Sequence, residues 1–272
     1  MGESLCVFFI YQGEIMKCLN DVSCKDCVGK VCKSKSSGDF KIVKYNNTAN
    51  GEIQFIDTGF ETVVRLGNIK SGNVKDPYVP SVHGVGIIGA KYPATVNGVL
   101  TKEYILWHSM LVRCYSDTSK KKNPTYEGCK CSENFKSYEY FYEWCQKQIG
   151  FANKDWHLDK DLLVKGNKIY SEDSCVFIPV EINSLLVKRE NMRGKYLIGV
   201  YWCNTKKVFV AQVSKNKGKS EYLGLFNTEI EAFNAYKKAK ENFIKEQANK
   251  WKSQIDERAY LALINYEVHI DD

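Results

Sequence analysis

The chain has 272 residues, of which 44% are hydrophobic and 26% charged, and it carries a formal net charge of +7. This length exceeds that of one compact domain and the composition is that of a folded protein, so we expect two or three domains. The sequence excludes a transmembrane helix, because no apolar run reaches the roughly 18–20 residues that such a helix needs.

The N-terminus carries a short apolar segment, residues 5–11, without the other features of a secretion signal. Glu3 stands where a signal peptide has positive charge, and no small-residue cleavage site follows. We therefore expect an intracellular protein without membrane contact, which starts either at Met1 or at Met16. Eleven cysteines in such a protein favour free thiols or metal ligands over disulfides.

The positive charge is concentrated toward the C-terminus. Residues 193–252 contain 13 Lys and Arg against 5 Asp and Glu, a net charge of +8. The rest of the chain contains 26 Lys and Arg against 27 Asp and Glu, a net charge of −1. A local concentration of this kind is typical of a surface that meets nucleic acid.

Residues 1–37 are rich in Lys, Ser and Cys, and we expect a partly flexible tail there. Cys24, Cys27 and Cys32 either bind Zn²⁺ or remain free thiols, since their C-x-x-C pair has no second pair to complete a zinc ribbon. Residues 38–98 contain short alternating β-branched runs between Asn- and Gly-containing turns, which predicts a small β-rich domain, either a barrel or an open sheet.

Residues 99–192 begin with two helical segments. Aromatic and apolar residues recur at helical spacing from Tyr104 and again from Phe135, which predicts two helices that pack on a core. A strand over 156–163, a short apolar strand over 175–179 and a helix are expected to follow.

The strand expected over 156–163 has an unusual face. His157, Asp159 and Asp161 share one parity, and successive strand side chains point to opposite sides, so the three lie on one face. Asp is depleted in strands. This face is either a metal-dependent active site, the remains of one, or a solvated edge.

Residues 193–272 carry three β-runs, 195–202, 207–214 and 221–226, and then a long helix whose start is marked by a capping box. Three strands and a helix form a two-layer unit in which the helix covers one sheet face. The other face is free for a partner. The candidate DNA-contacting residues on and around it are Arg193, Tyr201, Trp202, Lys206, Lys207, Lys215 and Lys219.

The motifs YLIGVYW, FVAQV, YLGLF and TEIEAFNAYKKA, which lie between residues 196 and 239, resemble the Apetala-type DNA-binding domain. In that family the three-stranded sheet lies in the major groove of DNA and reads it with Arg and Trp. The resemblance implies that Tyr201, Trp202 and the turn lysines contact double-stranded DNA. Lys stands where the family favours Arg, which implies phosphate contacts rather than bidentate reading of bases.

The stretches LWHSMLVRCYSD, YEGCKCSENFKSYEYFYEW and HLDKDLLVKGNKIYSEDSCVFIPVEIN resemble, in this order, phage-borne HNH (ββα-metal) homing endonucleases. In that family an Asp and the adjacent His end the first strand, a middle Asn orients the His, and a helix residue completes the metal site. The resemblance implies that Asp159 and Asn183 bind one Mg²⁺ or Mn²⁺ ion and that Asn167 is the middle Asn. It also implies host cytoplasm as the location of a phage-encoded protein.

The sequence departs from the HNH pattern at one position, because Lys160 stands where the family has its catalytic His. Lys has an ordinary pKa of about 10.4 and serves as a base at neutral pH only when that pKa is strongly lowered. His157 lies on the Asp159 face, about 6.6 Å along the strand, and is the other candidate base. Asp159, Lys160, His157 and Asn167 are therefore the candidate catalytic residues.

The sequence as a whole predicts an α+β multidomain protein. Its expected parts are a tail (1–37), a β-rich domain (38–98), an HNH-like ββα unit with flanking helices (99–192) and a C-terminal sheet plus helix with a helical extension (193–272). The expected function is a metal-dependent DNA endonuclease or nickase. The alternatives are a catalytically inactive DNA-binding protein on the same scaffold, and a phage protein that contacts a host factor.

Overall fold

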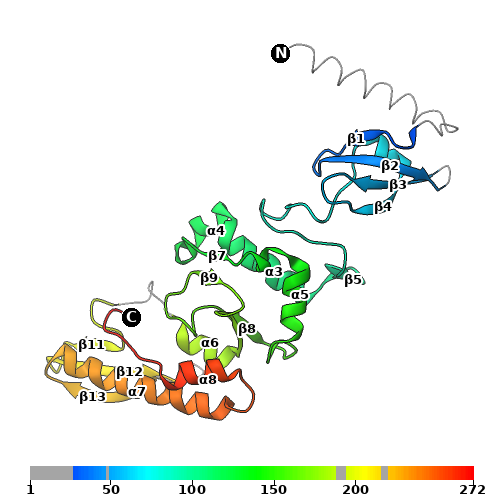
Figure 1. Cartoon of the computed structure of the whole chain (residues 1–272). Coiled ribbons are helices and arrows are strands. Elements are labelled where there is room, and N and C mark those ends of the chain that lie inside the picture. Colours follow the sequence, from blue (N-terminus) through cyan, green and yellow to red (C-terminus); the bar gives the residue numbers. More distant parts are fainter. Residues whose placement is uncertain (1–26, 47–48, 188–193, 216–219) are drawn as a thin grey trace. The chain divides into compact units, whose positions relative to one another are not determined.

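The computed structural model describes residues 27–46, 49–187, 194–215 and 220–272. They form a mixed α+β structure, as expected, that divides into two compact units (Figure 1). The first unit holds the described residues up to Val99 together with Ser137–Glu139, and the second holds those of Leu100–Lys136 and Tyr140–Asp272. Among the described residues of both units, no helix combines the length and the hydropathy of a membrane span.

The first unit is built on an antiparallel sheet with the linear strand order β1-β2-β3-β4. Alternate residues of β2 and β3 are buried, so one face of the sheet closes on an apolar core around Phe40, Ile53 and Phe55. The β-rich domain is therefore an open sheet. The elements are β1 (Val31–Lys33), β2 (Asp39–Tyr45), β3 (Asn50–Phe55), β4 (Glu61–Arg65) and the short helix α2 (Leu66–Ser71).

The sheet begins earlier in the chain than we expected. Strand β1 lies inside the segment 1–37, for which we expected a tail, and it pairs with β2 so that Cys32 stands opposite Phe40. Cys27 is fully buried in the same core. A strand of three residues is too short to show an alternating pattern in the sequence, which is why the strand was not predicted.

The second unit begins with helix α3 (Lys102–Tyr115), whose N-cap Thr101 accepts a hydrogen bond from the Tyr104 N–H at 3.3 Å. The helical spacing identified its core side, because Trp107 and Leu111 are fully buried. Helices α4 (Asp117–Lys122) and α5 (Tyr138–Gln146) follow along the chain. The short elements are β5 (Thr95–Val96), β6 (Val99–Leu100), η2 (Pro124–Tyr126), β7 (Lys130–Cys131), η3 (Asn134–Lys136) and β9 (Ile169–Tyr170).

A hairpin followed directly by a helix forms a ββα unit. Strand β8 (Trp156–Asp159) pairs antiparallel with β10 (Val176–Pro179), and helix α6 (Val180–Leu186) starts at the next residue. Both strands and the helix were predicted, but β8 ends at Asp159 rather than at residue 163. The Asp159 Oδ1 atom accepts hydrogen bonds from the Asp161 and Leu162 N–H groups, which turns the chain away from the sheet.

The start of β8 depends on a glycine. Gly150 has a φ of +88°, and a Cβ atom at this position would lie 2.1 Å from the ring of Trp156. Glycine therefore allows both the left-handed backbone and the close approach of the indole ring. The buried Trp156 ring anchors the first residue of β8 on the side opposite to His157.

The C-terminal part of the second unit has three strands and a long helix, as predicted, but the first strand starts at Val200 rather than at residue 195. Strands β11 (Val200–Cys203), β12 (Val208–Ser214) and β13 (Ser220–Phe226) form an antiparallel sheet, and α7 (Glu229–Trp251) packs on one face of it. The capping box is present, since Thr228 and Glu231 exchange hydrogen bonds of 3.2 and 3.1 Å. Helix α8 (Glu257–Ile264) follows.

Ring contacts, hydrogen bonds and an ion pair connect this C-terminal part to the ββα unit. The Trp156 and Trp251 rings meet edge to face with centroids 6.0 Å apart. Arg258 of α8 donates to the backbone carbonyl of Glu172 at 3.4 Å, and Lys165 forms a 2.8 Å ion pair with Asp272. The loop between β8 and β10 is thus held from outside at two positions.

Candidate functional site

The ββα unit brings two of the predicted site residues together. His157 projects from β8, where it stands opposite Ile178 of β10, and Asn183 projects from α6. The fully buried Ile182 fixes the rotation of α6, so that Asn183, one residue later, reaches the hairpin. The Asn183 Nδ2 and His157 Nδ1 atoms lie 2.8 Å apart, and the imidazole ring is exposed to solvent.

The tautomer of His157 depends on which atom of the Asn183 amide faces its Nδ1 atom. If the Asn183 Nδ2 group donates to Nδ1, then Nε2 carries the ring proton and the amide oxygen of Asn183 is left for another partner. If the amide is rotated by 180°, its oxygen accepts from Nδ1–H, and Nε2 has a lone pair that faces away from Asn183. Only the second arrangement makes His157 a base at Nε2, and only the first leaves the Asn183 oxygen free for a metal ion. The two roles therefore compete for one amide group.

Asp159 ends β8 two residues beyond His157, on the same face. Its Oδ1 atom accepts the Leu162 and Asp161 N–H groups at 2.7 and 2.8 Å, whereas its Oδ2 atom has no hydrogen-bond partner among the described residues. Partial burial of the carboxyl group raises its pKa, and the two N–H donors oppose this shift. The group thus offers one oxygen to a partner such as a cation.

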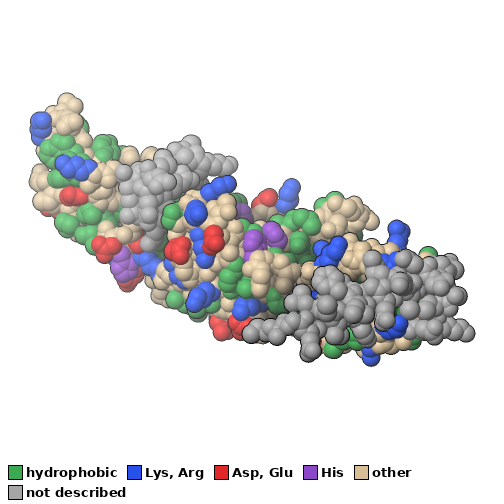
Figure 2. Space-filling model, turned by 90° about the horizontal axis from the view of Figure 1, so that it is seen from above, with side chains coloured by type: hydrophobic (Ala, Val, Ile, Leu, Met, Phe, Trp, Pro, Cys, Tyr) green, Lys and Arg blue, Asp and Glu red, His purple; other side chains and the backbone are tan. Residues whose placement is uncertain are grey.

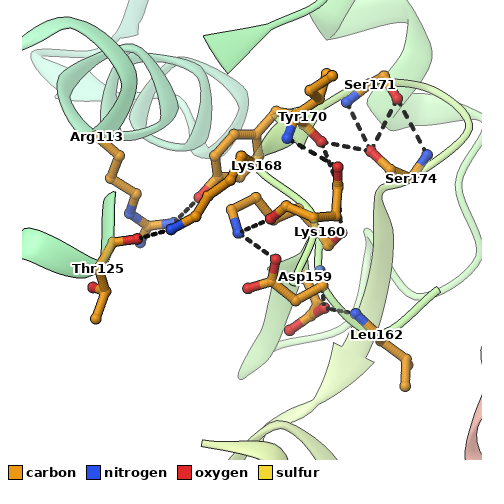
Figure 3. A network of polar contacts seen from close by, with 12 residues as sticks. Arg113, Thr125, Asp159, Lys160, Leu162, Lys168, Tyr170, Ser171 and Ser174 are labelled. Atoms are coloured by element: carbon orange, nitrogen blue, oxygen red, sulfur yellow. Dashed lines mark hydrogen bonds and ion pairs between the residues drawn. The ribbon is translucent and has the colours of Figure 1, made fainter. Parts of the chain in front are cut away.

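Lys160 is turned into the loop that follows β8 (Figure 3). Only 8% of its side chain is exposed, and its Nζ atom donates to the carbonyl of Asn167 at 2.7 Å and pairs with the Asp161 carboxylate. The ammonium group also lies 5.6 Å from the centroid of the Tyr170 ring. Its donors are thus engaged within the protein.

Asn167 forms hydrogen bonds back to Lys160 from the other side of the loop. Its Nδ2 atom donates to the carbonyl of Lys160 at 2.8 Å and to that of Ile169 at 2.6 Å, while its Oδ1 atom accepts the Ile169 N–H at 3.0 Å. Lys160 and Asn167 therefore exchange hydrogen bonds between the side chain of each and the backbone of the other. Asn167 thus holds Lys160, the residue that directly follows Asp159.

The donor set of the ββα unit suits a hard divalent cation with few protein ligands. The described residues contain no cluster of three or more His, Cys, Asp or Glu side chains suited to a metal. Mg²⁺ commonly binds through one or two carboxylates and completes its shell with water and phosphate oxygens. The free Oδ2 atom of Asp159 and the amide oxygen of Asn183 are ligands of this kind.

The sheet of the C-terminal part has one face free of α7. Tyr201, Val210 and Leu225 stand side by side across the three strands, and Tyr201 and Leu225 are 44% and 42% exposed. Tyr222 of β13 is 61% exposed on the same face, opposite Gln212. We had not predicted Tyr222 and Leu225 as surface residues, because alternation puts residues three apart on opposite faces and only the register shift between β12 and β13 brings both to one face.

The predicted contact residues of this sheet differ in their surroundings. Trp202 packs against Phe209 at 4.8 Å, and Phe209 belongs to the core beneath α7, so the ring lies on the helix side of the sheet. Lys206 and Lys207 are exposed in the β11–β12 turn. Lys215 pairs with Glu221 and lies over the Phe243 ring of α7. Arg193 and Lys219 lie outside the described residues.

The described cysteines of the predicted zinc group lie in apolar surroundings. Cys27 and Cys32 belong to the core of the first unit, and burial raises the pKa of the Cys32 thiol to about 11. A buried thiol with a raised pKa remains neutral at physiological pH, whereas Zn²⁺ binds the thiolate. Cys24 lies outside the described residues.

Comparison with known proteins gives no family for this chain. No model of a protein family matches it, and neither a curated protein nor a solved structure matches it significantly.

Proposed function

We propose that the protein is a DNA-binding endonuclease or nickase of the HNH homing type, which hydrolyses a phosphodiester bond of duplex DNA with one divalent metal ion. The observation that carries the proposal is the 2.8 Å contact of His157 with Asn183, on the strand that ends in the Asp159 carboxylate. A base, an orienting amide and a carboxylate with one free oxygen are the groups that metal-assisted phosphodiester hydrolysis needs.

Each of these groups has a separate role in the proposed reaction. Bound Mg²⁺ or Mn²⁺ would supply charge neutralisation at the scissile phosphate, with Asp159 Oδ2 as its protein ligand. His157 Nε2 accepts a proton from the attacking water, and the Asn183 amide, rotated by 180° so that its oxygen accepts from Nδ1–H, sets the tautomer. Lys160 and Asn167 keep the loop after β8 in place and thereby position the Asp159 carboxylate.

The C-terminal sheet is proposed as the surface that docks on duplex DNA, in the manner of an Apetala-type domain. Tyr201 and Tyr222 project from its free face, and Lys206 and Lys207 stand at the turn beside it. Lys side chains make point-charge contacts to phosphates, so this surface would bind DNA with weak sequence preference. The Trp202 ring packs toward α7 and supports the sheet from its other side.

A nicking assay on supercoiled plasmid tests the enzymatic part. We expect nicks with Mg²⁺ or Mn²⁺ that EDTA abolishes, and loss of nicking in Asp159→Asn. The amide still accepts the two N–H groups that end β8, so this variant keeps the turn. Asp155→Asn is the matched control, since it makes the same change at the other end of β8 on an exposed residue whose left-handed backbone Asn tolerates.

The second candidate is a DNA-binding protein that has kept the ββα scaffold without catalysis. It is favoured by the side chain of Lys160, which stands at the catalytic position of the HNH pattern and is turned into the loop. The two candidates differ in the plasmid assay, since only the first nicks. Duplex binding that weakens steeply with salt is expected for both. Absence of duplex binding would instead favour contact with a host protein.

A further inference from the structure

A second group of basic residues gathers beside the ββα unit, in a part of the molecule that the proposed sheet interface does not include. It comprises the end of α3, helix α4, strand β7 and the residue before β9. Helix α4 has no buried residue. We call the group the cationic patch, and its residues are Arg113, Lys120, Lys121, Lys122, Lys130 and Lys168.

The short helix η2 holds the patch together. The Arg113 guanidinium lies 5.5 Å from the centroid of the Tyr126 ring, and the Lys168 Nζ atom donates to the carbonyl of the adjacent Thr125 at 2.6 Å (Figure 3). Lys130 is joined to the same place, since its N–H donates to the Lys168 carbonyl at 2.8 Å. Cations from three segments of the chain thus meet around one turn.

The cations of the patch form no ion pairs with described residues. The nearby Lys136 and Lys165, by contrast, pair with Glu133 and Asp272 at 2.6 and 2.8 Å. Arg113 is half-buried, and its guanidinium meets the Tyr170 hydroxyl and an aromatic ring but no described carboxylate. The planar guanidinium fork is suited to bind two oxygens of an anion such as a phosphate.

The placement of the patch relates it to the ββα unit. Lys168 directly follows Asn167, which holds Lys160 in the loop after Asp159. Figure 2 shows that Lys and Arg side chains appear more often than Asp and Glu on the face it presents. The negative end of the helix dipole favours lysines in the last turn of α4, which accounts for Lys120, Lys121 and Lys122. It does not account for the three other cations of the patch, which lie on other segments.

We propose that the cationic patch binds the phosphate backbone of duplex DNA on the side of the ββα unit, as a second contact independent of the C-terminal sheet. This inference rests on the proposed function, because it takes the same duplex as the partner. Two separate contacts would hold the substrate across the site, and each phosphate neutralised by a lysine releases counter-ions from the duplex.

The test is duplex binding by fluorescence anisotropy between about 50 and about 200 mM salt. The full chain is compared with a Lys120→Gln, Lys121→Gln, Lys122→Gln variant, whose side chains are not buried, so that folding should be preserved. The matched control removes the same charge from the first unit, at the exposed residues Lys35, Lys41 and Lys75. Patch and control variants thus have equal net charge.

We expect the patch variant to bind roughly tenfold more weakly at low salt and to lose up to about 2.7 units from the slope of log affinity against log salt, since each of three phosphate contacts contributes about 0.9. The control should keep the wild-type slope. Equal slopes for the patch variant and the wild type would refute DNA binding by the patch and leave the proposed function intact. A wild-type chain that binds no duplex overturns both.

A second measurement does not depend on substitution. Bound duplex should protect Lys121, Lys122 and Lys168 from acetylation, read by mass spectrometry, while Lys41 of the first unit stays reactive. Unprotected patch lysines on a saturated complex would overturn the proposal. Nicking by the patch variant should fall at low DNA concentration and recover at saturation, because Asp159 and His157 are unchanged.

Discussion

Two asparagines of the ββα unit each bind a basic residue, but with opposite results. Asn167 and Lys160 exchange hydrogen bonds inside the loop, and the lysine side chain is only 8% exposed. Asn183 and His157 meet through a single 2.8 Å contact at the surface, and the imidazole remains open to solvent. The closed pair supports the loop, and the open pair can still meet a substrate.

The difference comes from where β8 ends. His157 and Asp159 lie within the strand and share its open face, but Lys160 lies in the turn that Asp159 itself caps. Lys160 is next to Asp159 in sequence, but its ammonium group binds the Asn167 carbonyl and the Asp161 carboxylate within the loop. A shift of function from residue 160 to residue 157 is consistent with this geometry, and four predictions test it.

The largest effect is expected from the open pair. His157→Ala should lower nicking by about 10²- to 10⁴-fold, the usual contribution of a general base, with little change in duplex affinity. His157 is exposed, so the unfolding midpoint should stay near that of the wild type. Single-turnover nicking beside a binding titration measures both quantities. His269, exposed and far along the chain, is the control for loss of an imidazole. Nicking that survives His157→Ala would remove the base from this position.

The closed pair should show its effect in stability. Lys160→Ala removes a buried ammonium and leaves the Asn167 carbonyl without its donor, which should lower the free energy of unfolding by about 3 kcal/mol. Thermal and denaturant unfolding measure the loss, and exposed Lys154→Ala is the control. A Lys160→Ala variant with wild-type stability and no nicking would reverse the comparison and make Lys160 a catalytic residue.

Asn183→Asp separates the two roles of the open pair. If the side chain orients His157, a carboxylate beside Nδ1 stabilises the imidazolium and raises the pKa of the base. The acid limb of the pH–rate profile should then move up by about one unit. If the side chain binds the metal ion, the added charge should instead lower the Mg²⁺ concentration needed for half-maximal nicking. A shift in metal requirement alone would contradict the role proposed for Asn183.

The smallest effect concerns Asp159 and pH. Burial raises the pKa of its carboxyl above the ordinary value of 3.8, so the folded protein holds this proton more tightly than the unfolded chain does. The resulting stability is fully present below the ordinary value and is lost as pH rises through the raised value. Asp159→Asn should therefore be no less stable than wild type at neutral pH, with a change below about 1 kcal/mol, and relatively less favourable in acid. Unfolding curves at several pH values measure this.

Much of the second unit could be predicted from patterns within short segments. The capping box at Thr228, the β-runs of the C-terminal sheet and the helical spacing of α3 each depend on neighbouring residues, and all three elements are present. Strand β1 could not be predicted, because its three residues are held by pairing with β2 and by burial of Cys32 rather than by their own pattern.

The candidate site was predictable in its residues but not in its contacts. Strand parity placed His157 and Asp159 on one face, and the resemblance to HNH endonucleases implied Asn183. The pairing of Asn183 with His157, and the inward turn of Lys160, depend on how α6 and the loop pack on the hairpin. Such packing is set by distant residues such as Ile182 and Tyr170.

The contact between Gly150 and Trp156 has a genetic consequence. Any side chain at Gly150 would meet the indole ring, displace the first residue of β8 and so move His157, one residue further on. Such a variant would keep all proposed active-site residues and still lose their alignment as the temperature rises. Heat-sensitive alleles of this protein should therefore arise at Gly150, a position that carries no chemistry of its own.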